Sequence, residues 1–198
     1  MICAIILAAG RSRRMGTQKL LLPFGGQSVI VHIADQILRG GVEQTIVVVA
    51  PDAAALAEAL AGRSITLVTN PDDEGDMLSS VRCGLRALPQ ECEAVLVVLG
   101  DQPAVRGELI AGMVHAMRTA GRPIVVPVHQ GRRGHPILFS ARYRQEVLTS
   151  HDGVGLRGML LRHPEDVLEL DVPSDWVLAD MDWPEDYRRE LERLKESE

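Results

Sequence analysis

The sequence has few cysteines and no long apolar run. Cys3, Cys83 and Cys92 are odd in number and form no C-x-x-C pair, so no disulfide framework is indicated. No stretch approaches the roughly 18 apolar residues that a membrane span requires. The N-terminal MICAIILAAG lacks the basic region and the polar stop of a signal peptide. We therefore expect a cytoplasmic protein with reduced, structural cysteines and no membrane association.

Basic residues are also in the minority. Lys and Arg number 21 against 27 Asp and Glu, which gives a formal net charge of −6. This balance argues against a general nucleic-acid-binding surface. The sequence shows no repeat, low-complexity segment or interdomain linker, and 198 residues suffice for one core. We predict a single domain over residues 1–198.

The two commonest phosphate-binding motifs are missing as well. Neither G-x-G-x-x-G nor G-x-x-x-x-G-K-[ST] fits the first glycine-containing loop, LAAGRSRRMGTQK at residues 7–19. This loop instead combines positive charge with backbone freedom. Gly10 and Gly16 allow backbone N–H groups to turn toward an anion, and Arg14 and Lys19 supply charge for phosphate oxygens. A triphosphate would suit the loop, and a solvated basic loop explains its charge equally well.

Short apolar runs rich in β-branched residues are present, without polar alternation, as is typical of strands covered on both faces. They lie at residues 2–7, 45–50, 64–69, 94–99 and 123–128. Helical spacing separates them, and the predicted helices begin with a cap at Ser28, at Asp52, near Leu78 and near Arg106. The alternation predicts an α/β fold, a three-layer sandwich around a mainly parallel, Rossmann-like sheet.

The pattern changes after residue 128. VHQGRRGHPILFS indicates a strand, a glycine-containing turn and a second strand, and we expect this β-hairpin to be attached to one edge of a parallel sheet. A glycine-rich segment, HDGVGLRGML, follows. The C-terminal PEDYRRELERLKESE predicts a charged surface helix with Pro184 at its first position and acidic residues in its first turn.

Acidic residues occur where ligands of an open parallel sheet bind, beyond the carboxyl ends of the strands. Asp101 directly follows the run at 94–99, where a carboxylate can hold Mg²⁺ together with substrate phosphates or cap the next turn. Asp180 and Asp182 alternate, so on a short strand they would point to the same side, and one of them could join Asp101 at a single cation. Two such carboxylates beside a basic phosphate loop suit metal-assisted phosphoryl or nucleotidyl transfer.

A polar segment, NPDDEGDMLSSVRCG at residues 70–84, leads into the third predicted helix. Ser79 and Ser80 suit capping of this helix, or hydrogen bonding to a base or ribose above the sheet edge. The acidic run before them is typical of a solvated loop and only occasionally of a metal site. It consists of Asp72, Asp73, Glu74 and Asp76.

Together these motifs resemble a known family. LAAGRSRRMGTQKLLLPFGG resembles the signature of the nucleotidyltransferases that attach a nucleotide to molybdopterin, L-A-[AG]-G-x-S-x-R-M-G followed by a Lys and L-L-P-[FW]. GDQP, GHPILF and the D-x-D-x-P-E-D-Y ending resemble the same family in the same order. The resemblance covers essentially the whole chain and implies a nucleotide-diphospho-sugar transferase-like fold. Its nucleotide-binding part would span about residues 1–128 and its acceptor-binding part about 129–182.

Two details concern the nucleotide. Ala9 makes the loop LAAG, which is similar to the cytidylyltransferase branch, whereas the guanylyltransferases typically have LAGG. The family segment G-M-x-x-S-x-x-x-G aligns with Met77, Ser80 and Gly84 here, but Asp76 stands at its first glycine.

The resemblance implies transfer of CMP from CTP to the phosphate of molybdopterin, with release of pyrophosphate and with Mg²⁺ as cofactor. Lys19 and Arg14 would hold the triphosphate, and Asp101 would hold Mg²⁺ together with Asp182; Lys19, Arg14 and Asp101 are the expected catalytic residues. The expected nucleotide-binding residues are Leu7, Ala8, Ala9, Gly10, Gly16, Lys19 and Ser80.

The acceptor is expected among the residues after 128. His135 either lines the acceptor's pocket or is an ordinary turn histidine, and Asp152 and Arg157 lie in a glycine-rich segment that suits a phosphate. The candidate acceptor-binding residues are Gly134, His135, Asp152 and Arg157. Other triphosphates, a sugar phosphate or another phosphorylated acceptor, and a non-catalytic molybdenum cofactor carrier are the alternatives. A molybdoenzyme or its chaperone is an expected partner.

Overall fold

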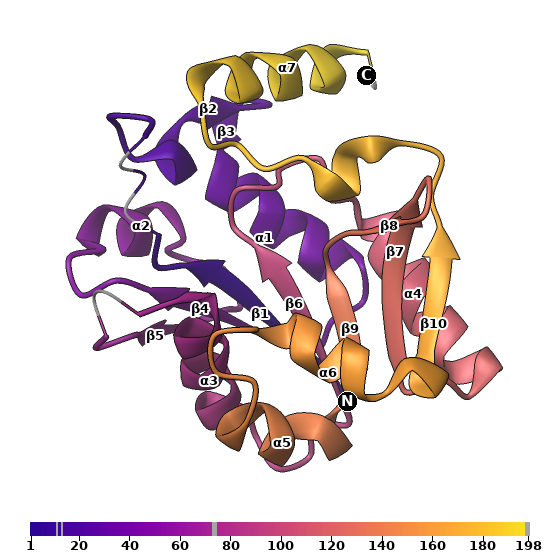
Figure 1. Ribbon diagram of the computed structural model, residues 1–198. Helices are drawn as coiled ribbons and strands as arrows, with labels where there is room; N and C mark the ends of the chain where they lie inside the picture. The colour runs from indigo at the N-terminus through magenta and orange to yellow at the C-terminus, as the bar shows by residue number, and fades with distance from the viewer. Residues whose placement is uncertain (11, 13, 73–74, 197–198) are drawn as a thin grey trace.

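The computed structural model describes residues 1–10, 12, 14–72 and 75–196. Its central sheet has the strand order β10-β7-β9-β6-β1-β4-β5, and the short β8 pairs with β7 (Figure 1). The strands of this sheet are β1 (Ile2–Ala8), β4 (Gln44–Val49), β5 (Thr66–Thr69), β6 (Ala94–Leu99), β7 (Ile124–His129), β8 (Arg132–Arg133), β9 (Ile137–Ser140) and β10 (Val167–Asp171). A separate hairpin consists of β2 (Pro23–Phe24) and β3 (Gln27–Ser28).

Parallel pairing dominates the sheet. β1 lies between β4 and β6 and is parallel to both, β5 is parallel to β4, and β10 is parallel to β7. The predicted mainly parallel α/β sheet is therefore confirmed.

Helices cover both faces of the sheet because the central strands are apolar on both sides. In β1, Ala4 and Ile6 belong to one buried cluster, and Cys3 and Ile5 belong to the other. The first cluster packs under α1 (Val29–Arg39), α2 (Ala54–Ala59) and α4 (Gly107–Ala120). The second packs under α3 (Met77–Ala87), α5 (Arg144–Thr149) and α6 (Leu156–Arg162) (Figure 1). The three layers expected from unalternating apolar strands are thus present.

The hairpin predicted after residue 128 exists, and it is attached to one edge of the parallel strands, as predicted. β9 pairs antiparallel with β7, and it also pairs with β6, the last of the adjacent parallel strands β5, β4, β1 and β6. Its residues Ile137, Leu138 and Phe139 are buried, which is possible because helices cover the sheet there. β10, whose residues are half-buried or exposed, pairs with β7 on the far side of this hairpin and forms the edge of the complete sheet.

Helix starts differ from the expectation at two loops. α2 begins after Ala53 and not at Asp52. α3 is capped by Asp76, whose carboxylate accepts a hydrogen bond from the backbone N–H of Ser79 at 2.9 Å, so Ser79 and Ser80 are not its caps. Asp precedes them in the chain and is an equally good capping residue, so it starts the helix earlier.

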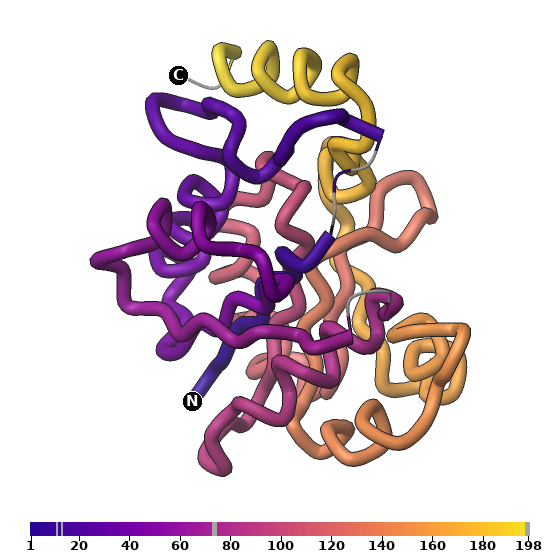
Figure 2. The backbone as a smooth tube through the Cα atoms, turned by 90° about the vertical axis from the view of Figure 1, so that its left-hand side faces the viewer, coloured from indigo at the N-terminus to yellow at the C-terminus, as the bar shows by residue number. Residues whose placement is uncertain are grey.

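The C-terminal helix α7 (Pro184–Lys195) starts with Pro184, as predicted. It lies along the β2–β3 hairpin (Figures 1 and 2), where the Tyr187 hydroxyl donates to the carbonyl of Pro23 at 2.6 Å. Before it, residues 179–183 are irregular, so the short strand considered for Asp180 and Asp182 does not form. In the described part of the chain, no helix has the length and apolar character needed to cross a bilayer.

Candidate active site

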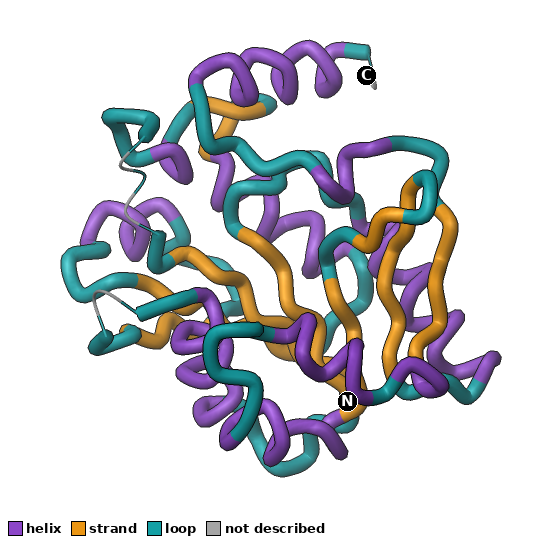
Figure 3. The backbone as a smooth tube through the Cα atoms, viewed as in Figure 1, coloured by secondary structure: helices purple, strands orange, loops and turns teal. Residues whose placement is uncertain are grey.

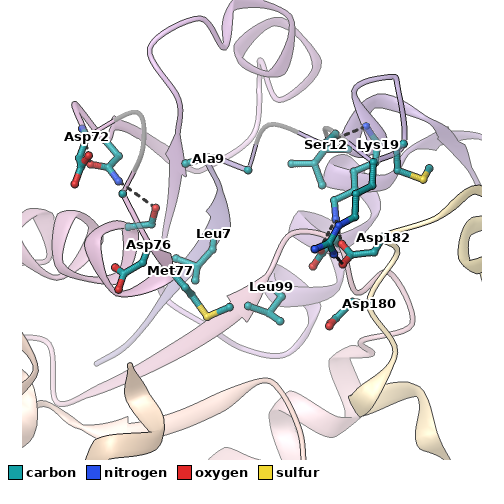
Figure 4. A pocket seen from close by; sticks show the side chains of 18 residues that line it. Leu7, Ala9, Ser12, Lys19, Asp72, Asp76, Met77, Leu99, Asp180 and Asp182 are labelled. Carbon is teal, nitrogen blue, oxygen red and sulfur yellow. Dashed lines mark hydrogen bonds and ion pairs between the residues drawn. The ribbon is translucent and has the colours of Figure 1, made fainter. Parts of the chain in front are cut away.

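A pocket of about 460 Å³ opens at the carboxyl ends of β1, β5 and β6. Figure 3 shows the loops that follow the strands. A late segment containing Asp180 and Asp182 completes its wall. The described lining residues are Leu7, Ala9, Gly10, Ser12, Arg14, Met15, Lys19, Leu20, Asn70, Asp72, Gly75, Asp76, Met77, Ser80, Leu99, Asp101, Asp180 and Asp182. Figure 4 shows Asp72 and Asp76 at one end of this pocket and Lys19, Asp180 and Asp182 at the other.

Lys19 connects two carboxylates at that second end. Its Nζ lies 2.5 Å from Asp101 Oδ2 and 3.0 Å from Asp182 Oδ1. The side chain is held there because a 3₁₀ turn, η1 (Lys19–Leu21), buries Leu20, and because the Lys19 N–H donates to Ser12 Oγ at 3.3 Å. Lys19 is consequently only 8% exposed, which is unusual for a lysine.

Arg14 adds a second cation to this cluster. Its Nη1 lies 2.7 Å from Asp182 Oδ2, and its side chain is largely exposed. The structure thus brings together the residues predicted for the triphosphate and the residues predicted for the metal. Without a substrate, the two sets neutralise each other.

The charges of the cluster support one another. Burial of the Lys19 ammonium opposes its charge, but Asp101 and Asp182 outweigh burial and raise the pKa of Lys19 above its ordinary value. The hydrogen bond from Lys19 in turn lowers the pKa of Asp182, and Arg14 adds to this effect. At neutral pH the lysine is therefore an ammonium and Asp182 a carboxylate.

Asp101 is positioned by the end of β6. A side chain at Gly100 would place its Cβ 2.6 Å from the carbonyl oxygen of Leu7, so a glycine is needed for β6 to approach β1 so closely. The carbonyl of Asp101 accepts the N–H of Met181 at 3.1 Å. Because Met181 is itself fully buried, this contact fixes Asp180 and Asp182 on either side of it.

Gln102 is a site residue that the sequence analysis missed. It is 2% exposed, and its Nε2 donates to Asp180 Oδ1 at 2.7 Å. Although Asp180 is exposed overall, its carboxyl is shielded from water, and this shielding raises the pKa of Asp180. The charges of Asp101 and Asp182 raise this pKa further, whereas the hydrogen bond from Gln102 lowers it. The position of Gln102 in the GDQP segment, next to Asp101, was the available signal.

The opposite end of the pocket is polar and partly buried. The Asn70 amide donates to Ser79 Oγ and to Ser80 Oγ, both at 3.1 Å. Ser80 is 7% exposed and lines the pocket. Asp72 and Asp76 also line it, whereas Asp73 and Glu74 of the acidic run lie outside the described residues.

Most of the predicted nucleotide-binding residues line the pocket, and two do not. Leu7, Ala9 and Gly10 belong to the lining together with Lys19 and Ser80. The side chain of Ala8 is buried on the opposite face of β1 from Leu7, in the cluster under α1, α2 and α4. Gly16 is exposed, with a left-handed φ of 65°, and is not among the lining residues.

The four predicted acceptor-binding residues lie outside the described lining of this pocket. At Gly134 a Cβ would sit 2.3 Å from the carbonyl oxygen of Val177, so the close approach of two backbones requires this glycine. Burial lowers the pKa of His135 to about 4, against the opposing effect of Asp101, so its imidazole is neutral at pH 7. Asp152 forms an ion pair with Arg82 at 2.6 Å, and Arg157 is exposed.

The donor set at the Lys19 end fits a divalent cation. Asp101 and Asp182 each place an oxygen within 3.0 Å of one positively charged atom, and Asp180 lies in the same wall. Carboxylate oxygens are the ligands that Mg²⁺ prefers, together with substrate phosphates. Elsewhere in the described chain, His163, Glu165 and Asp166 bring three ligand atoms within 4.8 Å of one another, but Asp166 is engaged by Arg142 and Tyr143.

The chain is similar to curated relatives over nearly its whole length. It is 29% identical to the molybdenum cofactor cytidylyltransferase of Escherichia coli K12, over 98% of both chains. It is 32% identical to the 2-C-methyl-D-erythritol 4-phosphate cytidylyltransferase of Cereibacter sphaeroides, over 89% of this chain and 94% of that protein.

Solved structures agree with the fold. A nucleotidyl transferase from Methanothermobacter, Mth528, superposes with a TM-score of 0.86 at 26% identity, over 100% of this chain and 99% of that one. Rv0371c of Mycobacterium tuberculosis, in a complex with manganese, gives 0.77 at 28% identity, over 96% of this chain and 98% of that one. These similarities confirm the nucleotide-diphospho-sugar transferase-like fold. The model of the MobA-like NTP transferase domain matches residues 4–167, and the chain therefore belongs to that family.

Proposed function

We propose that this nucleotidyltransferase transfers CMP from CTP to the phosphate of molybdopterin and releases pyrophosphate. The observation that carries the proposal is the contact of one ammonium, that of Lys19, with two carboxylates in a pocket at the carboxyl edge of the sheet. Such a cluster offers cations to a triphosphate and oxygen ligands to a metal. Similarity to a molybdenum cofactor cytidylyltransferase over the full length supports the acceptor, and Ala9 supports cytidine.

The two ends of the pocket suit the two parts of a nucleotide. Lys19 and Arg14 would turn from their carboxylate partners to the phosphates, whose negative charge is larger. Ser80 and Asn70, at the far end, offer hydrogen bonds to a base. This division leaves the apolar side chains of Leu7 and Leu99 between the ends, as Figure 4 shows.

Asp101 and Asp182 would hold Mg²⁺. When bound, the ion would neutralise charge that develops on the phosphate oxygens. The manganese complex of the similar Rv0371c supports a divalent cation.

In the proposed reaction, an oxygen of the acceptor phosphate forms a bond to the α-phosphorus of CTP. The bond from that phosphorus to the β-phosphate oxygen breaks, and pyrophosphate leaves. No protein nucleophile is needed and no general base is assigned, because the attacking phosphate is already anionic. The chain contributes position and charge, which supply most of the catalysis in such transfers.

The test is to incubate the protein with each of the four triphosphates, Mg²⁺ and molybdopterin, and to measure pyrophosphate. We expect release with CTP. A tenfold tighter binding of GTP than of CTP, about 1.4 kcal/mol in calorimetric titration, would contradict the cytidine assignment. A non-catalytic carrier would bind the pterin without releasing pyrophosphate.

A second candidate acceptor is 2-C-methyl-D-erythritol 4-phosphate. It is favoured by the 32% identity to a cytidylyltransferase that acts on this compound. The same assay separates the two, because each acceptor is added alone. Pyrophosphate with the erythritol phosphate and none with molybdopterin would replace the first candidate.

A further inference from the structure

Gln102 is a buried polar side chain for which the proposed reaction has no use. Its Nε2 donates to Asp180 at 2.7 Å. Its Oε1 is shielded from water and has no hydrogen-bond partner among the described residues. An unpaired buried carbonyl is unfavourable, and an apolar side chain of the same shape would avoid it. Packing alone therefore does not explain why an amide side chain occupies this position.

The contacts around Gln102 join two distant parts of the chain. The backbone carbonyl of Asp101 accepts the N–H of Met181, and the side chain of Gln102 holds the neighbouring Asp180. Two adjacent residues after β6 thus hold the late segment, one through its backbone and one through its side chain. Asp180 Oδ1 is engaged by the amide, while the residue lines the pocket beside Asp101 and Asp182.

We infer that Gln102 is a positioning residue, whose amide holds the Asp180 carboxylate as a third acidic group of the cation site. This inference rests on the proposed function, since it assigns a role within the same site. Mg²⁺ usually keeps several of its bound waters. A carboxylate beside the direct ligands therefore stabilises the ion by accepting hydrogen bonds from those waters. Residues around metal ligands commonly contribute 10- to 100-fold to metal affinity.

Chemistry explains why glutamine serves here. An ionised carboxylate only accepts hydrogen bonds, so the partner of Asp180 must be a donor. A positively charged donor would compete with the cation for Asp180. The neutral amide donates without adding charge to the site.

The test compares Gln102→Met, an apolar side chain of similar length, with the unchanged protein. Mn²⁺ binding is measured by titration calorimetry in the presence of CTP, and thermal unfolding is recorded alongside. We expect Mn²⁺ affinity to fall about tenfold or more, while the unfolding midpoint stays the same or rises, because the unpaired carbonyl is removed. Asp180→Asn should lower the affinity for Mn²⁺ similarly. The double variant should bind Mn²⁺ no more weakly than either single variant, because both changes remove the same contact between Gln102 and Asp180.

Gln36→Met is the matched control. Gln36 Oε1 accepts the N–H of Gly107 at 3.0 Å, away from the pocket, so this variant should lose stability and keep its Mn²⁺ affinity. Unchanged Mn²⁺ binding in Gln102→Met overturns the inference, as does weaker binding that is accompanied by a matching loss of stability. If the unchanged protein binds CTP but no Mn²⁺, the metal assignment in the proposed function falls and the inference falls with it.

Discussion

At the scale of single residues, the charge of Lys19 is what allows Asp101 and Asp182 to lie close together. Two carboxylates near one point repel each other, and the ammonium between them removes that repulsion. In the proposed reaction the same ammonium stabilises the phosphates that leave. In the proposed function, Lys19 therefore has a structural role without substrate and a catalytic role with it.

Replacing Lys19 by Ala should lower turnover with CTP by at least about 100-fold, or about 2.7 kcal/mol, the usual effect of removing one charge that stabilises a transition state. Lys19→Arg should not restore it, because a planar guanidinium cannot take the place of a point charge. Steady-state pyrophosphate release measures both. Lys195→Ala, on the exposed end of α7, is the control. A normal rate for Lys19→Ala would mean that the loop is simply a solvated basic loop.

Asp101 and Asp182 should be required together. Asp101→Asn and Asp182→Asn should each raise the Mg²⁺ requirement and lower activity, by several kcal/mol of transition-state stabilisation, about the size expected for a Lewis acid. Their effects should not add, because both serve one ion. Activity against Mg²⁺ concentration, with thermal unfolding, measures this. Near-normal activity of Asp101→Asn would favour the capping role and make Asp180 the next residue to examine.

At the scale of elements, side chains on helices make hydrogen bonds that tie the helices to neighbouring loops. Asp76 starts α3 and so fixes Ser79 and Ser80 relative to Asn70. Asp35, on α1, accepts two hydrogen bonds from Arg63, which follows α2. These contacts join helices to the loops between the strands, so each can be tested through the stability of the fold.

Asp76→Ala should lower the free energy of unfolding by about 1 kcal/mol, the usual effect of losing an N-cap. Asp76→Asn should keep most of it, because the amide oxygen still accepts from the Ser79 N–H. Urea unfolding of the two variants gives the comparison. Equal stabilities of the Ala variant and the unchanged protein would show that this cap contributes nothing measurable.

The ion pair of Asp35 and Arg63 predicts a pH dependence. The hydrogen bond from Arg63 lowers the pKa of Asp35 in the folded protein. Its stabilisation is therefore present above the ordinary aspartate pKa of about 4 and is lost as the pH falls through the lower, folded value. Asp35→Asn should lose stability at pH 6 and little at pH 2.5, as measured by urea unfolding. An equal loss at both pH values would contradict the assignment.

At the scale of the whole molecule, local patterns and long-range contacts were predictable to different extents. Unalternating apolar runs identified β1, β4 and β6, because strands buried on both faces need such side chains. Asp101 was found because it directly follows one of them. Asp182 was predicted from the D-x-D pattern near the C-terminus. Nothing in the residues around it indicates that its partner is Lys19, 163 residues earlier in the chain.

The features that could not be predicted from the sequence depend on contacts between segments that lie far apart in the chain. β10, which pairs with β7 on the far side of the hairpin, was not predicted from the sequence. The hydrogen bond of Gln102 to Asp180 spans 78 residues. Lys19 was assigned to phosphate, and its contacts with the two carboxylates appear only when the loops are placed in space.

The distance in sequence between Lys19 and Asp182 has a consequence for synthesis of the protein. A growing chain emerges from the ribosome beginning with its N-terminus, so Lys19 and Asp101 are available long before the segment that carries Asp180 and Asp182. The sheet can assemble from β1 to β9 while one wall of the pocket is still missing. If the proposed cation site is correct, a nucleotide and its cation can be held together only once the segment with Asp180 and Asp182 has been translated.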